Sequence, residues 1–185
     1  PEGITDGILK GMYLFKDSPK SELKVQLLAS GSILNEAVEA AKLLEEDWQI
    51  KSDVWSVTSY SELKKEAEDI ERWNNLNPLE KQKESYLNLC LNKKYPIIAV
   101  SDYVKLVSEQ ISSYVKSYFI SLGTDGFGRS DTRERLRDFF EINRYYIAIS
   151  AINSLVKTNK IDKKIMQKAI KKYNININKE NPLKI

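Results

Sequence analysis

Short apolar runs alternate along the chain with longer stretches in which apolar residues recur every three or four positions. Four of the runs carry β-branched or aromatic residues and are typical of buried strands. They cover residues 24–30, 52–59, 97–102 and 117–123. A further run, "GMYLFK" at 11–16, predicts a strand at a sheet edge. This alternation predicts a largely parallel sheet with helices on both faces, the three-layer α/β/α fold class.

Apolar spacing and capping residues predict the helices between these strands. Ser59, with Glu62 three residues later, forms a capping-box pattern. Residues 145–156 have the composition of a strand but the length of a helix, with Asn143 in front, and we expect a helix. Glu36 falls on a polar face of the first helix, away from the alanines that should meet the sheet. The other helices are expected over residues 33–48, 60–73, 79–91 and 103–114, from Thr132, and after Asp162.

Length and composition indicate a single globular domain. The chain has 185 residues, of which 42% are hydrophobic and 30% charged, and we expect residues 1–173 to form one domain and 174–185 a basic tail. No apolar run approaches the roughly 20 residues that cross a bilayer. The first residues lack the basic start and apolar stretch of a signal peptide. We therefore expect a cytoplasmic protein without a membrane partner.

The chain has no histidine and a single cysteine, Cys90. Triads built on histidine are excluded, and the usual zinc sites lack ligands. Cys90 has no histidine to activate it and lies in an apolar stretch that a helix would bury, so we interpret it as an inert thiol. We expect no catalytic, cofactor-binding or metal-binding residue in this chain.

Charge is distributed unevenly along the sequence. The net charge is +3, but the residues from Thr158 onward carry eight lysines and two carboxylates, a local charge of +6. A basic tail can bind nucleic acid or an acidic partner. The whole sequence is rich in Lys, Asn, Ile and Tyr, as an AT-rich genome favours, so we expect no nucleic-acid partner.

A glycine-rich stretch, "GTDGFGRSD" at 123–131, follows the last predicted strand. It should share the carboxyl edge of the sheet with residues 30–32, 57–62 and 101–102. The stretch fits neither the phosphate loop, nor the dinucleotide loop, nor the calcium loop. We interpret it as a connection and contact loop, with anion binding through Arg129 as the alternative. Its candidate contact residues are Asp125, Gly126, Phe127, Gly128, Arg129 and Asp131.

Arg129 is expected to organise this loop by pairing with Asp125, while Asp131 caps the helix that begins at Thr132. Phe127 either plugs the loop into the domain or projects toward a neighbouring chain. Five of the six arginines fall between positions 129 and 144. In a lysine-rich chain this cluster indicates two-pronged contacts with carboxylates or phosphates, or alternatively exposed ion pairs. The candidate partners in such ion pairs are Glu134, Asp138 and Glu141.

Several segments together resemble the C-terminal domain of the homodimeric, thiamine-diphosphate-dependent pyruvate dehydrogenase component. They include "KVQLLASGSILNEAVEAAKLL", "ERWNNLNPLE" and "LGTDGFGRSDTRERLRDFFE". The resemblance implies a five-stranded, mostly parallel sheet with one antiparallel edge strand, as in transketolase C-terminal domains. It also implies that upstream domains bind thiamine diphosphate and magnesium. The GDG…NN signature of that site is absent here, because "TDG" at 124–126 has no NN after it.

The resemblance implies a structural role, completing a homodimer and lining the approach to the active site. The expected partners are the other domains of the enzyme, a second copy, and the dihydrolipoyl acetyltransferase core. The parent would decarboxylate pyruvate and acetylate lipoyl groups, whereas this chain alone should be inactive. One alternative is the matching domain of a transketolase or deoxyxylulose-phosphate synthase. Another is a module that docks on the acetyltransferase core through its basic tail.

A domain taken from an obligate dimer should expose apolar side chains that its neighbours normally cover. The candidates are Tyr13, Phe15, Tyr114 and Tyr118.

Overall fold

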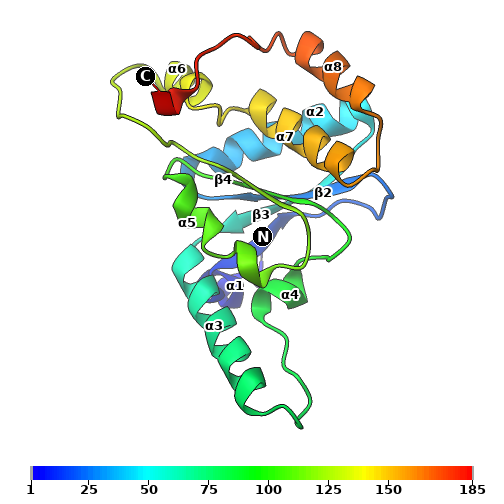
Figure 1. Ribbon diagram of the computed structural model, residues 1–185, viewed down its shortest axis with the longest axis vertical. Helices are drawn as coiled ribbons and strands as arrows, with labels where there is room; N and C mark the ends of the chain where they lie inside the picture. The colour runs from blue at the N-terminus through cyan, green and yellow to red at the C-terminus, as the bar shows by residue number, and fades with distance from the viewer. Residues whose placement is uncertain (1, 185) are drawn as a thin grey trace.

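A twisted sheet of five strands divides the molecule, in the order β1-β3-β2-β4-β5. The computed structural model describes residues 2–184 (Figure 1). Strands β2 to β5 are parallel, and β1 pairs antiparallel with β3 at one edge. The predicted fold class and antiparallel edge strand are therefore confirmed. The strands are β1 (Met12–Lys16), β2 (Lys24–Ala29), β3 (Lys51–Val57), β4 (Ile97–Val100) and β5 (Phe119–Leu122).

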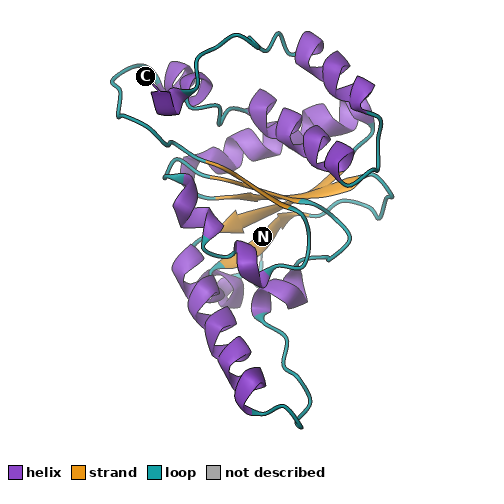
Figure 2. Cartoon of the chain, in the orientation of Figure 1, coloured by secondary structure: helices purple, strands orange, loops and turns teal. Residues whose placement is uncertain are grey.

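Helices cover both faces of the sheet (Figures 1 and 2). On one face α2 and α7 pack on the strands, and α8 packs on α7. The other face carries α3, α4 and α5 (Figure 1). The first layer comprises α2 (Leu34–Trp48), α7 (Arg144–Lys157) and α8 (Lys163–Lys172). The second comprises α3 (Tyr60–Leu76), α4 (Tyr86–Cys90) and α5 (Lys105–Glu109).

Shorter helices complete the chain. Two of them, α1 (Thr5–Lys10) and α6 (Arg133–Phe139), are α-helices, and the sequence pattern did not predict the first. Three are single 3₁₀ turns: η1 (Gly31–Ile33), η2 (Ser112–Tyr114) and η3 (Pro182–Lys184). The single helix expected over 103–114 is thus two shorter elements, α5 and η2. After η2 the chain extends again before β5.

The central strands read as continuous apolar runs because both of their faces are buried. Along β2, Val25, Leu27 and Ala29 enter the core beneath α2 and α7, while Leu28 enters the core beneath α3. Ala37, Ala40 and Ala41 of α2 are almost fully buried. These small side chains let α2 lie close to the sheet.

Several predicted helix starts are confirmed. The Ser59 hydroxyl accepts a hydrogen bond from the Glu62 N–H at 3.2 Å and begins α3. Asn143 accepts from the Tyr145 and Tyr146 N–H groups at 3.1 and 3.2 Å, so residues 145–156 are helical despite their strand-like composition. Asp162 accepts from the Lys164 N–H at 2.6 Å and begins α8. Each cap satisfies backbone donors that a helix leaves free at its first turn.

The predicted helix over residues 79–91 is wrong except at its end, where α4 forms. Asn74 accepts a hydrogen bond from the Lys83 N–H at 2.8 Å and donates to the Lys83 carbonyl at 3.0 Å, which fixes an extended loop. Ser85 then caps α4. Leu79 is 99% exposed. A helix over this stretch would have no apolar face to bury, so packing could not stabilise it.

Two of the four aromatic residues expected to remain uncovered are exposed. Phe15 and Tyr118 lie at the surface, whereas Tyr13 and Tyr114 are half-buried. The expectation that not all four are buried is therefore confirmed.

The segment after α8 returns across the domain to the carboxyl edge of the sheet, where η3 lies beside α6 (Figure 1). Ile175 packs against the core beneath α2 and α7, and Pro182 is buried. Positions 1 and 185, the outer ends of the two expected ranges, lie outside the described residues. Between residues 2 and 184, none of the helices combines the length and apolar character needed to cross a membrane.

Candidate contact site

The carboxyl ends of β2 and β4 form the point where the strand order reverses. From β2 the chain moves to β3 on one side, and β4 then pairs with β2 on the other. In open α/β sheets the loops at such a point gather around a crevice. Here the loop after β4 and the contact loop, residues 123–131, are joined by two hydrogen bonds. The Thr124 hydroxyl donates to the Asp102 carbonyl, and the Thr124 N–H to the Tyr103 carbonyl, both at 2.9 Å.

Gly123 permits this close approach. A Cβ atom at this position would lie 2.5 Å from the Tyr103 carbonyl oxygen. The two loops therefore lie together at one edge, as the sequence predicted. Residues 57–62 reach the same edge at the end of β3, where the Thr58 hydroxyl donates to the Ile8 carbonyl at 2.8 Å.

A cleft of about 550 Å³ lies between these loops and α6. Its lining includes charged side chains of both signs, among them Asp102, Asp131 and Arg137. The lining residues used below are Ser32, Asp102, Thr124, Arg129, Asp131 and Arg137.

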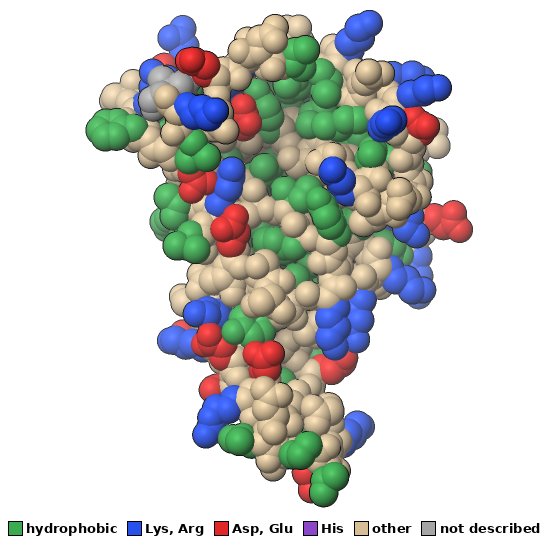
Figure 3. All heavy atoms as spheres, viewed as in Figure 1, with side chains coloured by type: hydrophobic (Ala, Val, Ile, Leu, Met, Phe, Trp, Pro, Cys, Tyr) green, Lys and Arg blue, Asp and Glu red, His purple; other side chains and the backbone are tan. Residues whose placement is uncertain are grey.

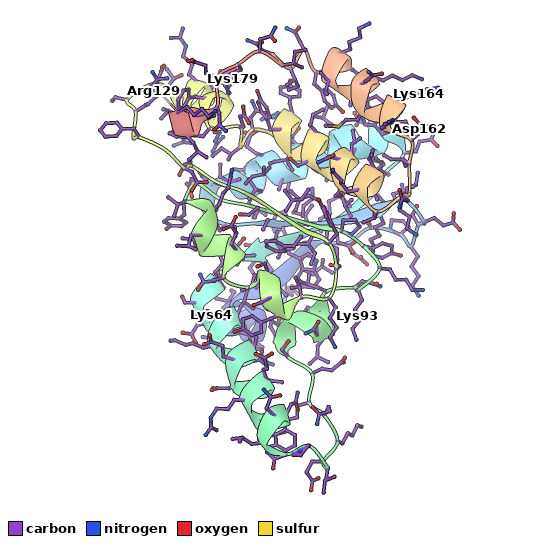
Figure 4. The ribbon with its side chains drawn as sticks, viewed as in Figure 1. Lys64, Lys93, Arg129, Asp162, Lys164 and Lys179 are labelled. Carbon is purple, nitrogen blue, oxygen red and sulfur yellow. The ribbon has the colours of Figure 1, made fainter. Side chains whose placement is uncertain are left out.

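The expected ion pair between Arg129 and Asp125 is wrong. The Arg129 guanidinium lies over the ring of Phe139, 4.2 Å from the ring centroid. Figure 4 shows Arg129 beside α6. Asp125 instead accepts a hydrogen bond from the Lys105 N–H at 3.2 Å, and its second oxygen lies 3.7 Å from the Lys105 ammonium. The cause is Thr124, whose two hydrogen bonds to the loop after β4 hold Asp125 against the start of α5.

The expected cap by Asp131 is also wrong. Helix α6 begins one residue later, and the Thr132 hydroxyl accepts from the Arg135 N–H at 3.4 Å. Asp131 accepts from the Thr132 N–H at 2.7 Å and lies 3.9 Å from the Arg135 guanidinium. Asp131 thus supports the turn in front of the helix, while Thr132 provides the cap.

Three further residues of the contact loop, Gly126, Phe127 and Gly128, differ in their surroundings. Gly126 has a φ of +107°, and a Cβ there would lie 2.6 Å from the Pro182 carbonyl oxygen, so the C-terminal segment packs directly on this residue. Gly128 faces open space. The Phe127 side chain is 84% exposed and projects outward. It therefore does not plug the loop into the domain, the first of the two orientations left open by the sequence.

Two of the five clustered arginines, Arg137 and Arg144, bind a buried carboxylate that the sequence placed on a polar face. Glu36 of α2 is only 5% exposed. Arg137 donates to its Oε1 at 2.9 Å, and the Arg144 guanidinium donates to both oxygens, at 3.0 and 3.1 Å. The Arg144 N–H adds a further bond at 3.0 Å. Arg137 also reaches the carbonyl and hydroxyl of Ser32 at 3.3 and 3.2 Å, which ties α6 to the loop after β2.

The electrostatics of Glu36 follow from these contacts. Burial alone would raise the pKa of its carboxyl group, but the hydrogen bonds from Arg144 and the charges of both arginines outweigh burial and hold the pKa below its ordinary value. The hydrogen bond to Glu36 raises the pKa of Arg144 in turn. The arginine cluster was the sequence signal for this two-pronged contact. Arg137 and Arg144 do not form the exposed ion pairs of the alternative. Their shared partner, Glu36, is buried and lies more than 100 residues away in sequence.

The contact loop does not fit a thiamine diphosphate site. The space beside Gly126 is occupied by Pro182, and the Asp125 carboxylate is engaged by Lys105. Within residues 2–184 no group of three or more Cys, Asp or Glu side chains is placed to hold a metal ion. The contact loop therefore presents a surface for contacts at the carboxyl edge of the sheet.

Residues 11–143 match the family described as the transketolase-like TK C-terminal domain. The chain belongs to this family. The structure of a transketolase from Leishmania mexicana shares the fold of this C-terminal-type domain, with a TM-score of 0.60 and 24% identity over 82% of this chain and 19% of the other.

Curated relatives of this C-terminal-type domain are more similar in sequence. The pyruvate dehydrogenase E1 component of Buchnera aphidicola subsp. Acyrthosiphon pisum is 50% identical over 98% of this chain, and that of Escherichia coli K12 is 47% identical over the same share. The domain spans about a fifth of the length of each of these two relatives, 20% in both cases. The resemblance to pyruvate dehydrogenase components is thus confirmed.

Proposed function

We propose that this chain is the C-terminal domain of a thiamine-diphosphate-dependent pyruvate dehydrogenase component that acts as a cytoplasmic homodimer. Identity of 47–50% to pyruvate dehydrogenase E1 components across nearly the whole chain carries the proposal. The same identity favours this function over a transketolase, because the transketolase neighbours are no more than 24% identical and share only the fold.

The role of the domain is structural. It completes the dimer and lines the approach to the active site, while other domains hold thiamine diphosphate and magnesium. The parent decarboxylates pyruvate and transfers the acetyl group to a lipoyl group of the acetyltransferase core. The proposed domain is residues 1–173 and the proposed basic tail is 174–185, in which Ile175 packs against the core and Pro182 is buried. In support, the Glu36 carboxylate is bound by Arg137 and Arg144 within the chain, and one oxygen of Asp125 accepts from the Lys105 N–H, which fits a scaffold.

Turnover measurements test this function. The full-length protein should oxidise pyruvate when supplied with thiamine diphosphate, magnesium and the other complex components, and should not use sugar phosphates. The 185-residue chain should neither turn over pyruvate nor show heat of binding for thiamine diphosphate with magnesium by calorimetry. Turnover by the 185 residues alone, or a sugar-phosphate substrate for the full-length protein, would contradict the proposal.

A further inference from the structure

Five large apolar side chains are exposed around the contact loop. Tyr103 and Val104 precede α5, Leu106 lies on it, Phe127 is in the contact loop, and Leu183 is in η3. Their exposed fractions are 61%, 46%, 71%, 84% and 58%. We name these five residues the carboxyl-edge patch. Several hydrophobic side chains lie at the surface on the left of the view, beside α5 and η3, with charged side chains among them (Figure 3).

Packing joins the three segments that carry the patch. Gly123 lies against the backbone from Tyr103 to Lys105, and Gly126 lies against Pro182, with the Leu183 Cα 3.6 Å from its Cβ position. The Asp125 carboxylate fixes the start of α5. Segments 20 and nearly 60 residues apart in sequence are therefore held as one surface.

The charge of the patch fits a permanent interface. Lys105 and Asp125, which lie between its apolar side chains, already pair with each other at 3.7 Å. Interface centres with few free charges and several aromatic residues are typical of obligate contacts, whereas transient partners meet more polar surfaces.

The position of α1 indicates what covers the patch. Strand β1 begins opposite the end of β3, with Met12 paired to Val57, so α1 lies at the carboxyl edge of the sheet. Any polypeptide upstream of α1 reaches the domain at this edge on the β1 side of the sheet, and it would have to cross the ends of β3 and β2 to cover the loops after β4 and β5. Leu9 of α1 is also 73% exposed. About four fifths of the length of the relatives lies outside the matched domain.

We propose that the carboxyl-edge patch is the surface on which the upstream part of the same polypeptide packs in the full-length enzyme. The inference rests on the proposed function, because it requires a parent chain of that kind. It assigns Phe127 and Leu106 as the central apolar contacts of this interface.

Hydroxyl-radical footprinting read by mass spectrometry tests the inference directly. Oxidation of Phe127 and Leu106 should be at least about tenfold slower in the full-length protein than in the 185-residue chain, because covered side chains are shielded from solvent. Leu89 is the matched control, since it is 67% exposed and lies on a five-residue helix like that of Leu106. Its oxidation should be the same in both proteins.

Two charge variants of the full-length protein provide a second test. Leu106→Asp should raise the oxidation of Phe127 several-fold, because a carboxylate in an apolar interface opens it. Leu89→Asp should leave that oxidation unchanged. These readouts need no catalysis. A full-length protein that fails to turn over pyruvate but protects the patch would overturn the proposed activity and leave this inference standing, because the inference requires only that this chain is one domain of a longer polypeptide.

Three results would overturn the inference. The first is equal oxidation of Phe127 in the full-length protein and the 185-residue chain. In the second, protection arises only when the 185-residue chain self-associates at high concentration, which would assign the patch to a second copy. In the third, protection arises only after addition of the acetyltransferase core.

Discussion

Replacing Glu36 by glutamine should destabilise the domain more than any other single charge removal on α2. The carboxylate is 5% exposed and accepts four hydrogen bonds from Arg137 and Arg144. Breaking a buried ion pair by removing one partner costs about 3–5 kcal/mol. Arg144 keeps 38% of its side-chain surface in solvent and can turn to water, and the glutamine oxygen still accepts, so we reduce the expected cost to about 2–3 kcal/mol.

Urea unfolding followed by circular dichroism measures this cost, with Glu39→Gln as the control. Glu39 lies on the same helix and contacts the same Arg144 at 3.7 Å, but its side chain is 37% exposed. Its replacement should cost much less than that of Glu36, because an exposed ion pair contributes little to stability. For a domain of this size, Glu36→Gln should lower the unfolding temperature by about 4–12 °C. Equal stabilities of the two variants would refute the reasoning.

The difference should also depend on pH. The pKa of Glu36 is lower in the folded than in the unfolded chain, so its stabilisation is fully present above the ordinary value of 4.5 and is lost as the pH falls through the folded pKa. The stability gap between wild type and Glu36→Gln should therefore be constant between pH 6 and 8 and narrow below about pH 4.5. A gap that does not narrow in acid would show that the carboxylate charge is not its source.

Three further predictions concern the contact loop and the cap of α6, and each is measurable by thermal unfolding. Gly126→Ala should cost about 1–3 kcal/mol, because of its positive φ and the nearby C-terminal segment, whereas Gly128→Ala should be close to neutral. Thr132→Ala should lower the free energy of unfolding by about 1 kcal/mol through loss of the cap of α6, and Asp131→Ala should lower it by less. A larger loss for Asp131→Ala than for Thr132→Ala would contradict the assignment of the cap. Arg129→Lys should cost about 1 kcal/mol or less, since an ammonium keeps the charge but loses the stacking over the aromatic ring, and a larger loss would require an ion pair that the structure does not contain.

The strands could be predicted because their signal is local. The run at β4 is apolar at all four positions and the run at β2 is apolar from Leu27 to Ala29, the pattern that favours a strand buried on both faces wherever its neighbours come from. The caps at Ser59, Asn143 and Asp162 were also readable, because a cap and its N–H donor lie within three residues of each other.

Three of the failures have the opposite cause, since each of these depends on a partner distant in sequence. Glu36 was assigned to a polar face because its arginines lie 101 and 108 residues away. Arg129 was paired with a nearby aspartate, but Lys105, 20 residues upstream, already holds Asp125. The helix expected over 79–91 was overridden by Asn74, which binds the backbone nine residues further on. Propensity and spacing cannot report such contacts.

The distance in sequence between Glu36 and its two arginines has a consequence for how the protein is made. Strands β1, β2 and β3 and helix α2 have all been synthesised by residue 57. At about 5–20 residues per second, a ribosome needs roughly 5–20 s more before Arg137 and Arg144 are added. During that interval α2 can settle on the nascent half-sheet only if the Glu36 carboxylate stays in water or takes up a proton. Arg137 and Arg144 would then bind the Glu36 carboxylate and cover this face of α2. Until these two residues have been translated, the emerging chain offers chaperones an exposed α2.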